Sequence, residues 1–367
     1  MKKLALALLF LFFTPFISTE NAIAASTITL SEVSHRQIDG KFFDDKLATL
    51  IAPDGRLGQL VFSPPIYSRT WLIDAALIDD VQLMANGYKL TSGKDGVGKD
   101  AAINWLARLR YISRADQVIA LPYGNPSGYW VHRLSPHSES YFLSVGAEHL
   151  TKFYGRIIKP TSNYGSYKYF RLTSYQSQAY YDTAKAIEAT AKYMDPVESE
   201  NIHLRSAMIF DQTLDQHRRN LLARDLYITT SDILQKIRLA PGKFTISANK
   251  QDLPITVIND FPSPANLILN VNALNSRVQV VDRISVKLDG KSRVQVKIPV
   301  EVLSAGDSSL AVGISNEQKQ QLGDYVVYPL TVRVLNPVAT WITYIAAVVL
   351  FISAVIQSVR RIRKRDR

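Results

Sequence analysis

Three aspartates in one short stretch are the side chains of this sequence best suited to chemistry. The stretch TWLIDAALIDDVQLMANGY, residues 70–88, begins as an apolar strand and then presents Asp74, Asp79 and Asp80. Many α/β enzymes hold their catalytic groups at the carboxyl end of a strand. Asp74 is therefore the first candidate for a catalytic acid, and Asp79 and Asp80 are the second choices.

A helix cap explains the same aspartate without any substrate. Asp74 directly precedes Ala75-Ala76-Leu77, where a carboxylate can accept hydrogen bonds from the exposed N–H groups of a first helical turn. Asn86-Gly87 then supplies residues that commonly end a helix. We favour the cap over the catalytic interpretation, because it needs nothing beyond the local sequence.

The sequence offers little for metal or cofactor chemistry. Of the six histidines only His132 and His137 are close to each other, and their spacing, with Pro136 between them, suits neither one helix face nor one strand face. The chain has no cysteine, which excludes thiolate ligands, disulfides and a thiol nucleophile. We therefore predict no metal site and no cofactor.

Tyrosines are concentrated in one polar segment that is the candidate binding region. Tyr164, Tyr167, Tyr169 and Tyr175 lie within YGSYKYFRLTSY, beside basic side chains. Such tyrosines could stack on sugar rings or hold a partner protein. A packing seam with hydroxyls that reach water is the simpler interpretation, and we favour it.

The amino terminus predicts export. Residues 1–24 carry Lys2 and Lys3, then the apolar run LALALLFLFF, and end with Ala22-Ile23-Ala24. These are the three parts of a secretory signal peptide.

The carboxyl terminus predicts an anchor. Residues 337–359 form an apolar stretch that is long enough for a transmembrane helix. Trp341 and Tyr344 would lie at one membrane interface, and Arg360, Arg361 and Arg363 would lie at the other, in a basic tail of residues 360–367. Because basic flanks stay inside, we expect a cytoplasmic tail that contacts anionic lipid of the bilayer and an extracytoplasmic body.

Hydrophobic periodicity divides the exterior into two parts. Over residues 25–196 short apolar strands alternate with helical stretches, as in an α/β domain. A helical connector follows at 197–242. Over residues 243–336 the period changes to two, which predicts an immunoglobulin-like β-sandwich.

Local signals refine this division. Thr173 with Gln176 predicts a capping box at the start of a helix. Asp289-Gly290 predicts a hairpin between RISVKL and SRVQVKIPVEV. Pro329 predicts that VVYPLTVRV is an edge strand.

Several segments together resemble a known family. They are HRQIDGKFFDDKLATLIAPDGRLGQL, TWLIDAALIDDVQLMANGY, AAINWLARLR, VIALPYGNP and FTISANKQDLPITVINDFPSPANLILNV, followed by the apolar stretch and the arginine-rich tail. From about residue 33 to the end, the chain resembles a short member of the DUF6049 family, uncharacterised actinobacterial single-span envelope proteins. The resemblance implies a hydrolase-like or degenerate β/α-barrel domain before the sandwich, and genes beside that of the lipid II flippase. It brings no catalytic residues.

We expect a non-enzymatic, single-pass cell-envelope protein whose exported domains bind a partner protein or a cell-wall polysaccharide. One alternative is a glycan hydrolase or deacetylase centred on Asp74, and another is an accessory subunit of a lipid-linked precursor flippase. The net charge of +11 is concentrated partly in the tail, so the exterior is only mildly basic and we expect no nucleic-acid partner.

Overall fold

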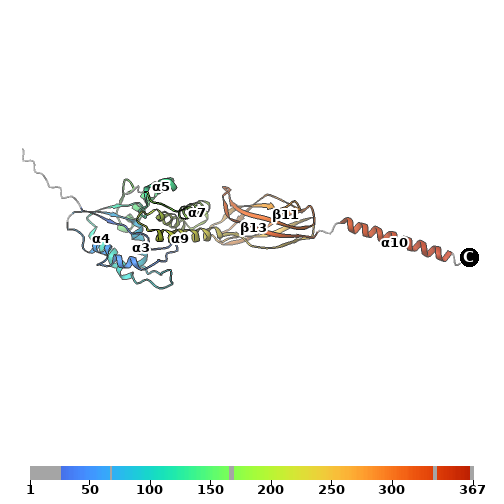
Figure 1. Cartoon of the computed structure of the whole chain (residues 1–367), viewed down its shortest axis with the longest axis horizontal. Coiled ribbons are helices and arrows are strands. Elements are labelled where there is room, and N and C mark those ends of the chain that lie inside the picture. Colours follow the sequence, from blue (N-terminus) through green and yellow to red (C-terminus); the bar gives the residue numbers. More distant parts are fainter. Residues whose placement is uncertain (1–25, 67, 165–168, 334–336, 364–367) are drawn as a thin grey trace, which may run out of the picture. The chain divides into compact units, whose positions relative to one another are not determined.

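The computed structural model describes residues 26–66, 68–164, 169–333 and 337–363, coloured by sequence in Figure 1. The predicted signal peptide lies outside these residues. The described residues form two compact units. Unit 1 takes those of Met1–His35, Phe42–Asn125 and Ser140–Tyr164, and unit 2 takes those of Arg36–Lys41, Pro126–Glu139 and Gly165–Arg367.

Unit 1 is built on a parallel sheet with the strand order β1-β2-β3-β4. The strands are β1 (Ser26–Leu30), β2 (Arg69–Ile73), β3 (Gln117–Ala120) and β4 (Lys159–Pro160). The helices of this part are α1 (Lys46–Ile51), α2 (Arg56–Phe62), α3 (Ala75–Ala85), α4 (Lys99–Ile112) and α6 (Glu139–Tyr154). Because the strands are parallel, their carboxyl ends meet at one edge of the sheet. The apolar strand predicted at the start of TWLIDAALIDDVQLMANGY is confirmed as β2.

Unit 2 begins with a group of helices. They are α5 (Gly128–Leu134), α7 (Ser174–Thr190), α8 (Pro196–Ser206) and α9 (Gln216–Gln235), with short 3-10 turns at Pro136–Ser138, Ala191–Tyr193 and Ala207–Phe210. The predicted capping box is confirmed: the Gln176 N–H donates to the Thr173 hydroxyl, and the Thr173 N–H donates to the Gln176 side chain. This reciprocal pair satisfies two donors that a helix start leaves without partners.

A β-sandwich completes the folded part of unit 2. One sheet has the order β10-β8-β12-β13-β6 and the other β5-β7-β11-β9. The strands are β5 (Ile237–Leu239), β6 (Phe244–Ile246), β7 (Lys250–Asn259), β8 (Ala265–Ala273), β9 (Val278–Val280), β10 (Arg283–Leu288), β11 (Ser292–Val302), β12 (Gly306–Asn316) and β13 (Gln321–Val332). The predicted alternation of β11 is confirmed, because Ile298 and Val300 are buried while Lys297 is exposed.

One local prediction about the sandwich is wrong, and another holds for part of a strand. Asp289-Gly290 does not close a hairpin: β10 pairs with β8 and β11 pairs with β7, so this turn carries the chain from one sheet to the other. Asn259 holds the turn by donating from its side-chain amide to the Asp289 carbonyl at 2.9 Å. The edge predicted from Pro329 is found over part of β13: β12 covers one side of the strand, whereas on the other side β6 pairs only with Leu330–Val332, just beyond the proline.

The helices and the sandwich of unit 2 share one hydrophobic core. Ile187 of α7, Ile202 of α8 and Ile233 of α9 belong to the same buried cluster as the inward side chains of both sheets. Polar bonds fasten the same junction: the Asn316 side-chain amide donates to the Ala189 carbonyl at 3.1 Å, and Lys192 pairs with Glu317 at 2.7 Å. The division therefore differs from the predicted boundary at residue 196, because α7 packs with the elements that follow it.

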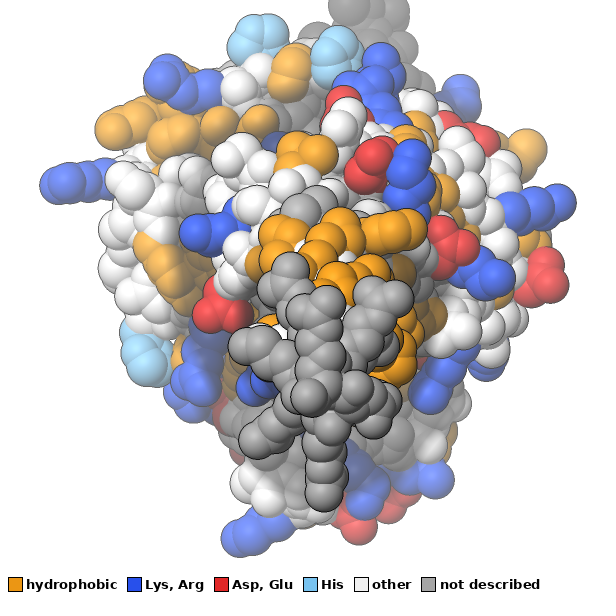
Figure 2. All heavy atoms as spheres, turned by 90° about the vertical axis from the view of Figure 1, so that its right-hand side faces the viewer, with side chains coloured by type: hydrophobic (Ala, Val, Ile, Leu, Met, Phe, Trp, Pro, Cys, Tyr) orange, Lys and Arg blue, Asp and Glu red, His pale blue; other side chains and the backbone are white. Residues whose placement is uncertain are grey.

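The last element is helix α10 (Pro337–Arg363), whose side chains are described for residues 341–357. Its large apolar side chains are exposed, among them Trp341, Tyr344 and Phe351 at 70%, 71% and 71%. Figure 2 shows apolar side chains gathered at the centre of the view. In the part of the chain that the structure describes, no helix meets both the length and the apolarity of a membrane crossing.

A short segment of the amino-terminal half belongs to unit 2 through buried polar contacts. The Ile38 N–H donates to the Asp225 carboxylate at 2.8 Å, and the Arg205 guanidinium donates to the Arg36 carbonyl at 3.0 Å. Burial raises the pKa of Asp225 to about 6, although the Ile38 N–H and Arg205 oppose the shift. The charged carboxylate is therefore the less favoured form in the fold.

This raised pKa predicts a stability that falls with pH. The unfolded Asp225 releases its proton near pH 3.8, so its neutral form stabilises the fold fully below that pH, and this contribution is lost as the pH rises to about 6. Two pKa units correspond to about 3 kcal/mol at most. We expect wild type to lose free energy of unfolding relative to Asp225→Asn between pH 4 and pH 7 in urea titrations. An unchanged difference would contradict the raised pKa.

The turn between the sheets makes a second prediction. A Cβ at Gly290 would lie 1.9 Å from the Pro262 carbonyl oxygen, whereas one at Gly242 would meet only ordinary contacts of 3.5 Å or more. We expect Gly290→Ala to lower the free energy of unfolding by about 1–3 kcal/mol, because the backbone must shift. The matched Gly242→Ala variant should be nearly neutral. Equal unfolding midpoints for the two variants would show that this turn tolerates a side chain.

Candidate functional site

The first candidate, Asp74, lies at the carboxyl end of β2 and is buried, with 1% of its surface exposed. One carboxylate oxygen accepts the N–H of Ala76 at 2.9 Å and the N–H of Gly124 at 2.9 Å. The first bond caps α3, as the favoured interpretation predicts, and the second joins α3 to the segment after β3. Asp74 therefore holds two backbone donors that water does not reach.

Asp79 has a more open setting one turn and a half further along α3. Its carboxylate accepts the Tyr123 hydroxyl at 2.8 Å, and the same oxygen lies 2.8 Å from Nδ1 of His149 on α6. Tyr123 and His149 also contact edge to face, with ring centroids 5.4 Å apart. The side chains of Asp79 and His149 are 22% and 23% exposed. This arrangement can orient an imidazole and hold a proton between the two side chains.

The third aspartate has a structural setting like that of Asp74. Asp80 is buried, and the Ser34 hydroxyl donates to it at 3.3 Å. Close in sequence to that serine, Nδ1 of the buried His35 lies 2.8 Å from the Asp44 carboxylate. Nε2 of His35 has no hydrogen-bond partner among the described residues. The three predicted aspartates thus lie on one helix or its cap, but they contact three different partners.

Sequence reasoning missed Tyr123 and His149. Both are ordinary residues for their elements, and His149 lies 70 positions from the aspartate that it contacts. No local pattern could have joined them. Within the ranges that the structure describes, no group of His, Asp and Glu side chains has the arrangement of a metal site.

The candidate tyrosines do not form one surface. Tyr164 is buried in unit 1, and Tyr167 lies outside the described residues. Tyr169 is 60% exposed and contacts Tyr129 edge to face, with centroids 5.3 Å apart. Tyr175 is 46% exposed and stacks on Tyr227, with centroids 4.9 Å apart. The structure therefore separates these tyrosines into several settings.

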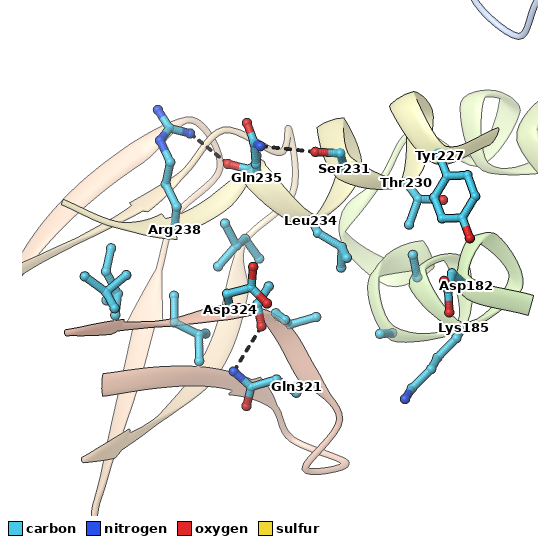
Figure 3. A pocket seen from close by; sticks show the side chains of 18 residues that line it. Asp182, Lys185, Tyr227, Thr230, Ser231, Leu234, Gln235, Arg238, Gln321 and Asp324 are labelled. Carbon is cyan, nitrogen blue, oxygen red and sulfur yellow. Dashed lines mark hydrogen bonds between the residues drawn. The ribbon is translucent and has the colours of Figure 1, made fainter. Parts of the chain in front are cut away.

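Unit 2 contains an open pocket of about 530 Å³ that the sequence did not indicate. We call it the helix–sandwich pocket; α7, α9, β5, the end of β12 and the start of β13 line it (Figure 3). Leu234, Ile237, Leu239, Leu322 and Val326 contribute apolar surface. Asp182, Lys185, Arg238 and Asp324 contribute charge. The volume lies within the usual range of ligand sites.

Two side chains of the pocket lining, Arg238 and Tyr227, remain formally charged and neutral, respectively. Arg238 donates to the Gln235 carbonyl at 2.9 Å and pairs with Asp260, so its charge is largely compensated. Burial, followed by the charge of Asp182, raises the pKa of Tyr227, which therefore keeps its proton at neutral pH. The pocket holds donors and acceptors on a mostly apolar lining, which suits binding.

The predicted membrane-interface residues all belong to α10. Trp341 and Tyr344 are exposed, and Arg360, Arg361 and Arg363 fall within the bounds of the helix, although their side chains lie outside the described part. Their contact with lipid stays a prediction.

The chain belongs to the DUF6049 family, which is described as a family of unknown function, and the match covers residues 168–367. The match covers most of unit 2 and the carboxyl terminus, so the family resemblance of earlier segments stays a prediction. No curated protein matches the chain.

Three solved structures that resemble the chain each match 26–28% of it. E. coli alpha-2-macroglobulin in its native conformation is 21% identical with a TM-score of 0.21, over 26% of this chain and 6% of that one. A C. elegans MSP family member is 13% identical with a TM-score of 0.21, over 26% and 97%. A human ASH/PapD-like domain is 10% identical with a TM-score of 0.22, over 28% and 86%.

The cap interpretation of Asp74 makes a testable prediction. Asp74→Ala removes the acceptor of two buried N–H groups, so we expect the free energy of unfolding to fall by about 1–3 kcal/mol. Asp74→Asn keeps a side-chain oxygen that can accept these bonds, so its free energy of unfolding should fall by less. Chemical denaturation followed by circular dichroism measures both changes. An alanine variant as stable as wild type would contradict the cap.

Proposed function

We propose that this protein is a single-pass protein of the cell envelope whose exported part acts by binding another molecule, in the first place a partner protein. The observation that carries the proposal is the contrast between two places in the chain. Asp74, at the carboxyl edge of the parallel sheet, and Asp80, within α3, are buried and hold bonds within the fold. The helix–sandwich pocket is open and offers a binding surface.

The anchor is proposed from the sequence of α10. Residues 341–357 contain no charged side chain, and the basic tail of residues 360–367 follows them. The apolar side chains of this helix are exposed, which is costly in water and favourable in lipid. The tail would remain in the cytoplasm by the positive-inside rule, and the body of the chain would lie outside it.

Unit 1 fits this proposal as a scaffold. Its four parallel strands follow one another in chain order, as neighbouring strands of a β/α barrel do, and they number half of the eight in a complete barrel. A degenerate barrel would keep the stability of the fold without the full set of catalytic loops. A cell-wall polysaccharide is the alternative ligand of such a domain.

A second candidate function rests on one specific observation. Asp79 and His149 form a partly exposed pair, with Nδ1 of His149 2.8 Å from a carboxylate oxygen of Asp79. In β/α enzymes the catalytic side chains lie at the carboxyl edge of the parallel sheet. A glycan hydrolase or deacetylase would therefore use Asp79 with His149, whereas the buried Asp74 would position α3. A role as a flippase subunit stays a prediction.

The two candidates can be separated with the full-length protein in membranes of its own host. We expect a tagged wild-type protein to co-purify with a stoichiometric partner after mild detergent extraction, and Asp79→Asn to retain that partner. Release of sugar or acetate from purified cell wall by wild type, lost in Asp79→Asn, would favour the enzyme. Protease added to intact spheroplasts should digest the body of the chain; full protection would contradict the proposed orientation.

A further inference from the structure

One edge of β13 is only partly covered. β6 pairs with Leu330–Val332, and among the residues that the structure describes no strand pairs with residues 321–329 on that side, although α9 and β5 contact β13. A strand edge without a partner presents a row of N–H and C=O groups that can pair with another extended chain. We call residues 321–329 the uncovered edge.

The helix–sandwich pocket lies against this edge. Gln321, Leu322, Asp324 and Val326 of β13 line it, and Leu234 of α9 lines it from the helical side (Figure 3). The apolar lining side chains can receive alternate side chains of an added strand, which project from its two faces in turn. An uncovered edge next to an apolar pocket combines the two requirements of strand addition, namely backbone pairing and side-chain pockets.

Charge at the rim indicates what the added segment carries. Asp324 is exposed and has no hydrogen-bond or ion-pair partner among the described residues. Arg238, by contrast, is paired with Asp260, and the other basic residue of the lining, Lys185, belongs to α7 and not to the strand edge (Figure 3). A lysine or arginine of a ligand would therefore find its counter-charge at Asp324, next to the first residues of the uncovered edge.

We propose that the helix–sandwich pocket binds an extended peptide segment of a partner protein, which adds as a β-strand to the uncovered edge and places a basic residue against Asp324. The proposal deepens the binding function proposed above and rests on it. Rigidity favours such binding, because α7 and α9 are fastened to the sandwich by the shared core and by Asn316. A small molecule bound in the same pocket would use the side chains alone.

Peptide selection on the full-length protein in detergent micelles tests the proposal. A phage-displayed library of random nine-residue peptides is selected against wild type, after depletion on Leu234→Arg, whose guanidinium would fill the pocket. We expect peptides with alternating apolar residues and one basic residue. Ile228→Arg places the same group on α9 at a residue that is 48% exposed and does not line the pocket, so it should leave binding unchanged.

Backbone methylation separates strand addition from binding by side chains alone. The N–H groups of alternate residues point to the same edge of a strand. Two versions of the selected peptide are N-methylated, one at odd and one at even positions. We expect one version to bind roughly ten-fold or more weakly, because several hydrogen bonds of about 1 kcal/mol each are lost, and the other to bind nearly as well as the parent.

Asp324→Lys supplies a variant that does not threaten folding, because the side chain is exposed. We expect this variant to bind the basic peptide more weakly and to bind more tightly a peptide that has glutamate in place of the basic residue. The proposal is overturned if no peptide is selected, if both methylated versions bind alike, or if Leu234→Arg binds like wild type while melting normally. A native partner that still co-purifies in those cases leaves the binding function standing and removes only this site.

Discussion

The structure of unit 2 depends on the burial of helical apolar faces against the inner surfaces of the sandwich. Ile187, Ile202 and Ile233 enter the same core as the strands, and Tyr193 contacts Phe261 with centroids 6.1 Å apart. Burying one large apolar side chain contributes about 1.5–3 kcal/mol, so a few such contacts can hold the helices against the sandwich. A pocket between these elements has walls that belong to one core, and its shape needs little ordering on binding.

Burial also explains why the three aspartates of the 70–88 stretch have different roles. A buried carboxylate must be compensated by donors, and Asp74 receives two backbone N–H groups while Asp80 receives a hydroxyl. Their placement resembles that of catalytic acids because the ends of parallel strands are also the starts of helices that need caps. Asp79 differs, since it contacts a histidine and a tyrosine and remains partly exposed.

Local features of the fold could be predicted because local chemistry determines them. The Thr173–Gln176 capping box, the cap at Asp74 and the alternation of β11 each depend on residues within a few positions. The Asp289-Gly290 hairpin was wrong because a turn signal does not specify which sheet each flanking strand joins. That choice depends on pairing with β8 and β7, which lie far away in sequence.

The sites were harder to predict for the same reason. Tyr123 and His149 meet Asp79 only after β3 and α6 have packed, and the helix–sandwich pocket assembles from residues 182 to 326. The predicted domain boundary at residue 196 also differs from the division into compact units. The apolar stripe of α7 predicts that this face is buried, but it does not specify which elements cover it. Periodicity predicts that a face is buried, but it does not predict against what.

Hydrogen exchange of the β13 amides in the full-length protein is the most direct test of strand addition to the uncovered edge. On addition of a saturating selected peptide, we expect slower exchange for amides within residues 324–328 and unchanged exchange for β9, Val278–Val280. Protection confined to the segments around Asp79 and His149 would contradict strand addition, since the ligand would then occupy the edge of the parallel sheet and not the helix–sandwich pocket.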